Sequence, residues 1–250
     1  MIQLQNVTVA YGDRVILNHI DLDVHAGETL AILGASGSGK STILRLIMGL
    51  QRPTSGKIFI DGKDITSYSE DQLDTVRQHM GMVFQYSALF DSMTVGENVA
   101  FGPRQHGHYT EAEITQIVKD RLHLVGLDGT ENMMPNDLSG GMKKRVSLAR
   151  AIALNPQIIL YDEPTAGLDP LRCMDINRLI VSMQHHLKAT SLIVTHDMDS
   201  AFYVADRLAY LENGAFRLIA SKEDFRQTTD RDVQLFIHGG DIPPERRRDT

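Results

Sequence analysis

A glycine-rich stretch near the N-terminus carries the residue types that bind phosphate. It reads Gly34, Ala35, Ser36, Gly37, Ser38, Gly39, Lys40 and Ser41, and it matches G-x-x-x-x-G-K-[ST] at every fixed position. Glycines let such a turn wrap its backbone amides around phosphate oxygens. We expect Lys40 to reach the outer phosphates of a nucleotide and the Ser41 hydroxyl to coordinate Mg²⁺. The alternative interpretation is a flexible loop with a solvated lysine.

The elements on either side of this stretch favour phosphate binding over a flexible loop. Residues 29–33 form a short apolar run typical of a buried strand, and residues 42–48 have apolar positions at helical spacing. A helix that begins directly after the turn points the positive end of its dipole at a bound anion. The order of strand, glycine-rich turn and helix therefore predicts a phosphate-binding loop.

Two adjacent acids, Asp162 and Glu163, follow a second apolar strand predicted over residues 158–161. Burying both acids is unfavourable unless a cation or a chemical role compensates them. We expect Asp162 to bind Mg²⁺ through a coordinated water molecule and Glu163 to polarise the water that attacks a γ-phosphate. The alternative is a strand end that turns into solvent.

Three further residues are candidates on weaker grounds. Gln85 ends a strand predicted over residues 80–85, and His196 follows one over residues 190–195. Either alone indicates little, but together they could contact the attacking water, the metal or the γ-phosphate. Tyr11 lies just before a turn, where an aromatic ring could stack on a nucleobase or simply belong to the core or the turn.

The predicted elements indicate an α/β fold. Buried strands alternate with helices, which predicts a parallel sheet with both faces covered. Ligands of such sheets bind at the carboxyl ends of the strands, where the glycine-rich loop, Asp162, Glu163 and His196 all fall. Antiparallel strands are predicted over residues 2–24, with a turn at 12–13, and a hairpin over residues 208–219. No convincing strand occurs in residues 86–155, which we interpret as a helical insertion.

The composition restricts the classes of function. The 250 residues are 42% hydrophobic, enough for a substantial core, and their formal net charge of −7 argues against non-specific nucleic-acid binding. Cys173 is the single cysteine, which excludes an internal disulfide and suits a reducing compartment. We find no signal-peptide pattern and no apolar run long enough to cross a bilayer, so action at a membrane would require a partner.

The order of the motifs resembles an ABC transporter nucleotide-binding subunit. A second turn, Leu138-Ser139-Gly140-Gly141, places exposed amides at a helix start and has the form of a phosphate cradle. With Tyr11, the phosphate loop, Gln85, the Asp162–Glu163 strand, residues 167–169 and His196, it follows the order of that family from Met1 to about Leu218.

This resemblance implies a fold and its subdivision. The family has a P-loop NTPase core of the RecA-like type, an antiparallel β subdomain and an inserted helical subdomain. Applied to this chain, residues 1–225 would form the ATP-binding domain, with the core in 1–85 and 156–225 and the helical subdomain in about 86–155. Residues 226–250 would form a C-terminal extension, in which Arg246, Arg247 and Arg248 are expected to be disordered and solvated.

The resemblance also implies a mechanism in which two copies of the chain face each other head to tail. The signature residues Ser139, Gly140 and Gly141 of one copy would close on ATP held by the phosphate loop, from Gly34 to Thr42, of the other. Tyr11 would stack on adenine, and Gln85 would join the metal to the coupling surface. Glu163 would act as the base, Asp169 would bridge the dimer, and His196 would sense the γ-phosphate.

The signature departs from the usual family pattern because Met142 stands where a glutamine is common. A methionine cannot repeat the hydrogen bonds of an amide, so a nucleotide contact through that position is in doubt. Lys143, Lys144 and Arg145 follow, with a solvated helix face as the simplest interpretation, which we favour for Lys143.

Three segments, residues 138–146, 84–95 and 232–239, resemble one subgroup, the ATPases of Mla-type phospholipid transporters. Such a protein maintains the lipid asymmetry of the Gram-negative outer membrane. It works at the cytoplasmic face of the inner membrane, bound to an integral-membrane permease, with a lipid-binding partner and a small regulatory subunit. The helical subdomain would receive a coupling helix of the permease, for which Leu89 and Phe90 are candidate contacts. Those two residues could equally belong to the core.

Other functions remain open from the sequence. The same ATP chemistry could power a solute importer, for example for amino acids. A soluble ABC protein acting on DNA or ribosomes would be expected to have long coiled coils or two cassettes in one chain, which the sequence lacks. An inactive regulator is disfavoured because Lys40, Asp162, Glu163 and His196 are all intact.

Overall fold

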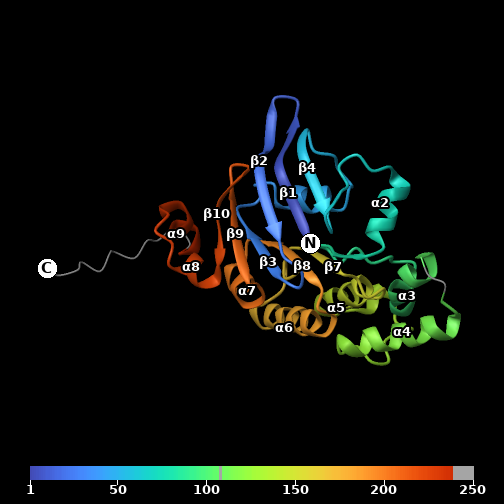
Figure 1. Cartoon of the computed structure of the whole chain (residues 1–250). Coiled ribbons are helices and arrows are strands. Elements are labelled where there is room, and N and C mark those ends of the chain that lie inside the picture. The colour runs from blue at the N-terminus through green and yellow to red at the C-terminus, as the bar shows by residue number, and fades with distance from the viewer. Residues whose placement is uncertain (107–108, 239–250) are drawn as a thin grey trace.

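The strands form an antiparallel sheet and a mostly parallel one (Figure 1). The structure is a computed structural model that describes residues 1–106 and 109–238. The antiparallel sheet has the order β2-β1-β4-β5, with β1 (Ile2–Tyr11), β2 (Arg14–Val24), β4 (Ser55–Ile60) and β5 (Lys63–Asp64). The larger sheet has the order β10-β9-β3-β8-β7-β6, with β3 (Thr29–Leu33), β6 (Met80–Val83), β7 (Ile158–Asp162), β8 (Thr190–Thr195), β9 (Arg207–Glu212) and β10 (Ala215–Ser221).

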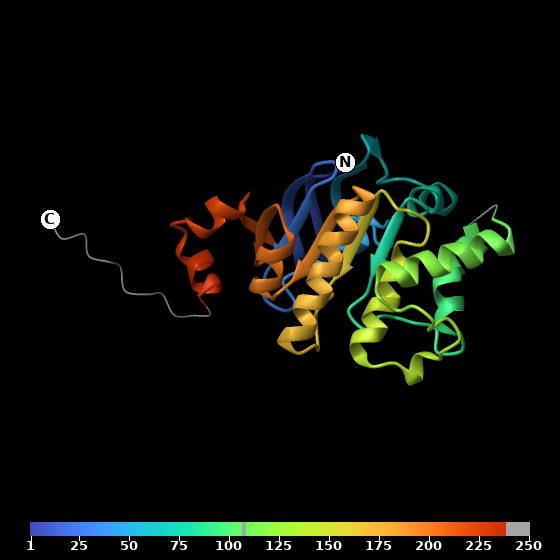
Figure 2. The same ribbon diagram turned by 90° about the horizontal axis from the view of Figure 1, so that it is seen from below.

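The helices lie mainly on one face of the larger sheet, as the view from below shows (Figure 2). They are α1 (Lys40–Ile47), α2 (Glu70–Arg77), α3 (Val95–His106), α4 (Glu111–Leu124), α5 (Gly140–Ala151), α6 (Pro170–Leu187), α7 (Met198–Val204), α8 (Lys222–Arg226) and α9 (Arg231–Ile237). Between β6 and β7 the described residues form only helices and connecting segments, as predicted for the insertion. Within the described ranges, no helix combines the length and the apolar character that a membrane span requires.

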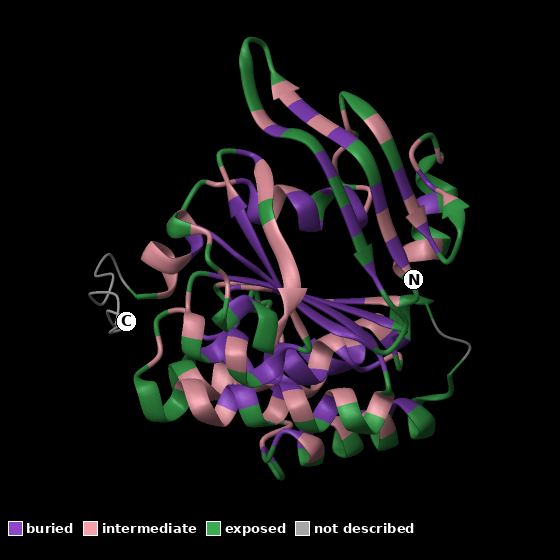
Figure 3. Cartoon of the chain, turned by 60° about the vertical axis from the view of Figure 1, so that its left-hand side comes forward, coloured by how far each residue is buried: buried purple, intermediate pink, exposed green. Residues whose placement is uncertain are grey.

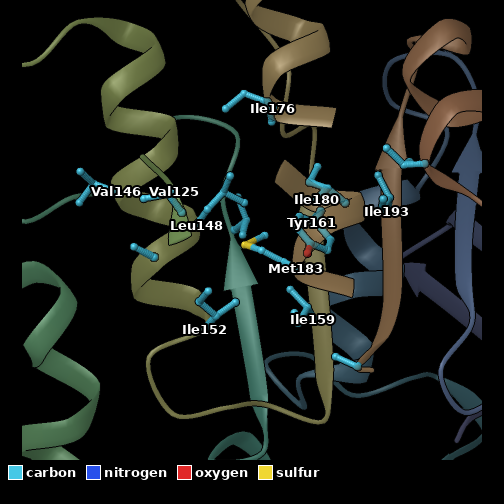
Figure 4. Packing of buried hydrophobic residues seen from close by; sticks show 14 of the residues in the cluster. Val125, Val146, Leu148, Ile152, Ile159, Tyr161, Ile176, Ile180, Met183 and Ile193 are labelled. Carbon is cyan, nitrogen blue, oxygen red and sulfur yellow. The ribbon is translucent and has the colours of Figure 1, made fainter. Parts of the chain in front are cut away.

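The larger sheet is buried on both faces because its strands alternate their side chains between two hydrophobic clusters. Leu30 and Ile32 of β3 face the antiparallel sheet and α1, whereas Ala31 and Leu33 face the cluster that includes α5 and α6. The inner strands β3, β8, β7 and β9 are accordingly almost wholly buried, whereas β10 at one edge is only partly buried (Figure 3). Figure 4 shows the second cluster, in which Ile159, Tyr161 and Ile193 of the sheet pack with Leu148, Ile152, Ile180 and Met183 of the helices. The predicted parallel sheet with two covered faces is confirmed.

The structure corrects one strand boundary and adds helices that were not predicted, among them α2 and α3. The strand predicted over residues 80–85 ends at Val83, so Gln85 lies in the loop beyond it. Helix α2 was not predicted, although Ser69 and Gln72 form a capping box at its start. Helix α3 was also missed, although the Thr94 amide donates to Glu97 at 2.7 Å. Each of these helices is short or has few apolar residues at helical spacing. The capping residues at their starts were therefore a stronger signal for them than apolar periodicity.

The end of the described chain packs back onto the larger sheet. Val233 of α9 is fully buried, and the ring of Phe236 lies 4.7 Å from the ring of Tyr210 on β9. Arg217 of β10 forms an ion pair with Asp232. The predicted division into residues 1–225 and an extension 226–250 stays a prediction, and the expectation for 246–248 lies outside the described residues.

Candidate functional site

Strand register brings the predicted site residues to one edge of the larger sheet. Leu33 at the end of β3 pairs with Thr195 of β8, and Asp162 at the end of β7 pairs with Val194 of the same strand. The loops that follow these three parallel strands therefore begin side by side. This edge carries the glycine-rich loop, Glu163 and His196.

The glycine-rich loop has a backbone that only glycine can provide at two positions. Gly39 has φ 108°, and a Cβ there would lie 2.7 Å from Leu17 Cδ2. A Cβ on Gly34 would lie 2.4 Å from the carbonyl oxygen of Leu211. Ser38 Oγ is buried without a hydrogen-bond partner among the described residues. This hydroxyl lies beside the amides at the start of α1, which have no partner within the helix. Together they could donate hydrogen bonds to a phosphate.

Lys40 is buried at the start of α1, where its side chain turns back over the loop. Its Nζ donates to Gly34 O at 2.7 Å and to Ala35 O at 3.0 Å, and it lies 3.8 Å from Glu163 Oε1. Burial lowers the pKa of Lys40, while the negative charges of Glu163 and Asp162 oppose that effect. The ammonium is thus held at the rim of the loop, next to the predicted phosphate position.

Asp162 and Ser41 are directly joined, since Ser41 Oγ donates to Asp162 Oδ1 at 2.9 Å. Burial raises the pKa of Asp162, the Ser41 hydrogen bond opposes this, and the nearby charge of Glu163 raises it further. A hydroxyl and a carboxylate at this spacing are oxygen ligands of the kind that Mg²⁺ prefers. The pair fits a magnesium ion that would be shared with nucleotide phosphates.

Glu163 is the most constrained side chain of the site. Its Oε2 accepts hydrogen bonds from Thr195 Oγ1 at 3.1 Å and from the His196 amide at 3.4 Å, and it lies 3.0 Å from His196 Nδ1. Its backbone has φ 47°, a left-handed conformation that is uncommon for a residue other than glycine. Such strain is maintained only where the surrounding structure fixes it, and it often marks a functional position.

These residues enclose a cavity of about 790 Å³, within the size range of small-molecule sites. Its lining includes Tyr11, Ala35, Ser36, Gly37, Gly39, Lys40, Ser41, Thr42, Gln85, Glu163 and His196, all of which were predicted site residues. Arg14, Ile16, Arg45 and Phe236 also line it and were not predicted. A second cavity of about 470 Å³ adjoins it, because Arg14, Ile16 and residues 35–37 line both. Gln85 thus reaches the site from the loop after β6.

The signature residues lie apart from this cavity in the same chain. Ser139 is the N-cap of α5 and accepts from the Met142 amide at 3.3 Å. Ser139, Gly141 and Met142 line a separate cavity of about 440 Å³. Asp169 caps α6, where its carboxylate also pairs with Arg172 at 3.2 Å. A single chain therefore does not bring Ser139, Gly140, Gly141 or Asp169 to the phosphate loop.

The cations after the signature have different environments. Lys143 is half-buried, and its side chain makes no hydrogen bond or ion pair with other described residues. Arg145 donates to Val125 O at 2.9 Å. Lys144 is only 5% exposed, and its Nζ donates to Gln85 O at 2.5 Å. No local pattern in the sequence marks Lys144 as pointing to the site, because its neighbours are also basic.

Comparison with known proteins identifies the family. The model of the family described as ABC transporter matches residues 17–166. The chain belongs to the ABC transporter family. Members of this family bind and hydrolyse ATP, so the predicted ATPase activity and the predicted ATP ligand are confirmed. The predicted P-loop NTPase fold of an ABC transporter cassette is confirmed as well.

Individual relatives extend the similarity over nearly the whole chain. It is 41% identical over 246 residues to the intermembrane phospholipid transport ATP-binding protein MlaF of Haemophilus influenzae, which covers 98% of this chain and 93% of the relative. It is 41% identical over 243 residues to mkl of Mycobacterium leprae, a protein named for ribonucleotide transport, covering 97% of this chain and 70% of the relative. A solved dimeric ATP-binding cassette in a post-hydrolysis state with ADP and phosphate aligns with a TM-score of 0.81 at 34% identity, covering 89% of this chain and 99% of that chain.

Tyr11 offers a first test of the ABC transporter site. Its side chain is 58% exposed at the edge of the cavity, so it contributes little to the core. Stacking of a base on an aromatic ring contributes about 1–3 kcal/mol. Tyr11→Ala is therefore expected to weaken ATP binding by roughly 5- to 150-fold in calorimetry, whereas Tyr11→Phe keeps the ring and the affinity. Equal ATP affinity of wild type and Tyr11→Ala would remove the stacking role.

Proposed function

We propose that this chain is the ATPase subunit of a transporter that moves phospholipid between the inner and outer membranes. The observation that carries this proposal is the 41% identity to MlaF over 93% of that protein's length. The match to MlaF spans the nucleotide site, the helical insertion and the C-terminal segment and leaves little of MlaF unmatched, whereas only 70% of mkl is matched. The role would be to maintain the lipid asymmetry of an outer membrane.

In this proposal Glu163 is the general base of ATP hydrolysis. Its carboxylate is fixed by Thr195 and His196 and faces the cavity next to Lys40. Mg²⁺ would neutralise part of the negative charge on the phosphates of ATP. Ser41 and Asp162 would hold the ion, with Gln85 as a further ligand from the loop after β6. His196, beside Glu163, would respond to the γ-phosphate.

The ATP site would be completed by a second copy of the chain. Ser139 and Gly140 are exposed, Gly141 is half-buried, and all three lie outside the ATP cavity of their own chain, which supports contact in trans. Asp169 caps a neighbouring helix and would lie at the same contact. The solved relative is dimeric. ATP would then hold two chains together, and its hydrolysis would release them.

A membrane permease is the proposed partner, bound at the cytoplasmic face of the inner membrane. Phe90 is 39% exposed and packs its ring 4.7 Å from Phe101, while Leu89 is partly buried against the core. Asn98 fixes this segment by donating to Phe90 O at 3.1 Å. Phe90 is thus the better candidate for contact with a coupling helix. Lipid-binding and small regulatory subunits complete the proposed complex.

The test is lipid movement by the intact complex. The tagged chain, purified with its permease from the membranes of the source organism and reconstituted in vesicles, is expected to transfer fluorescent phospholipid only with ATP. The same complex with Glu163→Gln serves as the control and should transfer none. ATP hydrolysis without any lipid transfer would contradict the proposed cargo while leaving the ATPase assignment intact.

A solute importer is the second candidate. The same identity of 41% to mkl, which is named for ribonucleotide transport, favours it. Its distinguishing result in the same vesicles is ATP-dependent accumulation of a labelled pyrimidine ribonucleotide without transfer of phospholipid.

A further inference from the structure

Lys144 occupies a buried position between two parts of the ATP site. It lies on α5, and its Nζ donates to the backbone carbonyl of Gln85 at 2.5 Å and to that of Glu163 at 3.5 Å. Those carbonyls belong to the loop after β6 and to the turn after β7, which are far apart in the sequence. One ammonium group therefore links the backbones of two residues assigned to the hydrolysis of ATP.

The two backbone segments have conformations that need support. Glu163 has φ 47°, and Ser87 and Ala88 have φ 63° and 46° in the loop after Gln85. Left-handed conformations of residues other than glycine are unfavourable unless surrounding contacts fix them. The carbonyls of Gln85 and Glu163 both accept from Lys144, and that of Glu163 also accepts from the Ala166 amide at 3.1 Å within its own turn.

A second cation of α5 supports the same loop. Arg150 donates to Ala88 O at 2.7 Å and to Ser87 O at 3.0 Å, and its guanidinium lies 5.6 Å from the ring centre of Phe90. Arg150 makes no contact with Glu163. Lys144 is thus the member of the pair that reaches both segments.

A buried ammonium is unfavourable for folding, so its presence calls for a reason. An ammonium has three donors and no acceptor, and its burial without compensation costs several kcal/mol. Burial lowers the pKa of Lys144, while the negative charges of Glu163 and Asp162 oppose that effect. An apolar side chain of similar length would fill the same space at lower cost to stability. The charge of Lys144 is therefore better explained by a role in the ATP site than by a contribution to the stability of the core.

We propose that Lys144 is a positioning residue, which holds the backbones of Gln85 and Glu163 in the relative geometry that hydrolysis requires. The proposal rests on the assignment of these two residues to ATP hydrolysis. Lys144 does not line the cavity of the ATP site, and it acts through the two carbonyls. Helix α5 begins at the signature residues Ser139 and Gly141 and also carries Lys144. It therefore connects the signature to the backbones of Gln85 and Glu163 in the same chain.

The test compares three variants of the complete complex. Lys144→Met removes the charge and keeps the length, Lys144→Arg restores a cation that can donate to both carbonyls, and Lys143→Met changes a neighbouring lysine without described side-chain partners. Displacing catalytic groups by about 1 Å can cost 100-fold in rate. We expect Lys144→Met to lower kcat at least tenfold, with the ATP dissociation constant within twofold of wild type and the melting temperature unchanged or higher. Lys144→Arg should recover kcat to within threefold, and Lys143→Met should match wild type.

Specific outcomes would overturn the proposal. The first is a kcat of Lys144→Met within threefold of wild type. The second is a lowered kcat that Lys144→Arg does not recover, and the third is a decrease in ATP affinity as large as the decrease in kcat. If Lys144→Met does not fold, Lys144→Ala is measured against the same criteria, and failure of both to fold would assign the residue to stability instead. Wild-type hydrolysis, measured in parallel, tests the ATPase assignment separately, because its absence would contradict that assignment whatever the variants do.

Discussion

Glu163→Gln is expected to lower ATP turnover by about 10²- to 10⁴-fold, the contribution of a positioned general base. The amide keeps the size of the carboxylate, and it can still contact Thr195 Oγ1 and His196 Nδ1, which lie 3.1 and 3.0 Å from Glu163 Oε2. It cannot take a proton from water. ATP should therefore bind but persist, and the ATP-bound dimer should accumulate. Phosphate release and size-exclusion chromatography with ATP measure the two effects.

The control for this substitution is Glu223→Gln, which removes one negative charge from an exposed position on α8. It is expected to hydrolyse ATP at the wild-type rate. If Glu163→Gln also turned over at the wild-type rate, Glu163 would lose its role as base, and the three contacts that fix its carboxylate would be structural.

Lys40→Ala is expected to weaken ATP binding by roughly 10- to 100-fold, since hydrogen bonds to charged groups contribute about 1.5–3 kcal/mol each. The Lys40 ammonium now donates to Gly34 O and Ala35 O, at 2.7 and 3.0 Å, and is held beside the loop by these contacts. Its loss removes the cation nearest the predicted phosphate position. Calorimetry with ATP measures the change. Lys119→Ala, an exposed lysine on α4, is the matched control, and wild-type ATP affinity in Lys40→Ala would contradict the loop assignment.

A mixture of two inactive variants tests whether the signature acts in trans. Lys40→Ala damages the phosphate loop, and Ser139→Arg blocks the signature, so each homodimer contains only damaged sites. A mixed dimer has one site with both defects and one intact site. Activity is therefore expected to reappear on mixing. Its absence, with mixed dimers present, would contradict the head-to-tail arrangement.

Local sequence patterns predicted the parts of the site that depend on short segments. The loop at Gly34, the strand ending in Asp162 and the N-cap at Ser139 each combine a characteristic residue type with its flanking element. The parallel sheet followed from alternating buried runs, because its burial pattern is a property of each strand. The predicted end of β6 at residue 85 was wrong. In the described structure β6 is an edge strand that pairs with β7, and the last pair joins Val83 to Tyr161. No local signal marks where that pairing stops.

By itself, then, the sequence determined the phosphate loop, the acidic pair and the family, since contiguous residues with fixed backbone requirements specify them. Only the tertiary structure decided that Lys144 meets Gln85, 59 residues away, and that Phe236 lines the same cavity as Tyr11. Both contacts depend on how α5 and α9 pack against the sheet. A lysine among basic neighbours and a phenylalanine on a short helix have the same local pattern whether they face solvent, the core or a site, and long-range packing makes the choice.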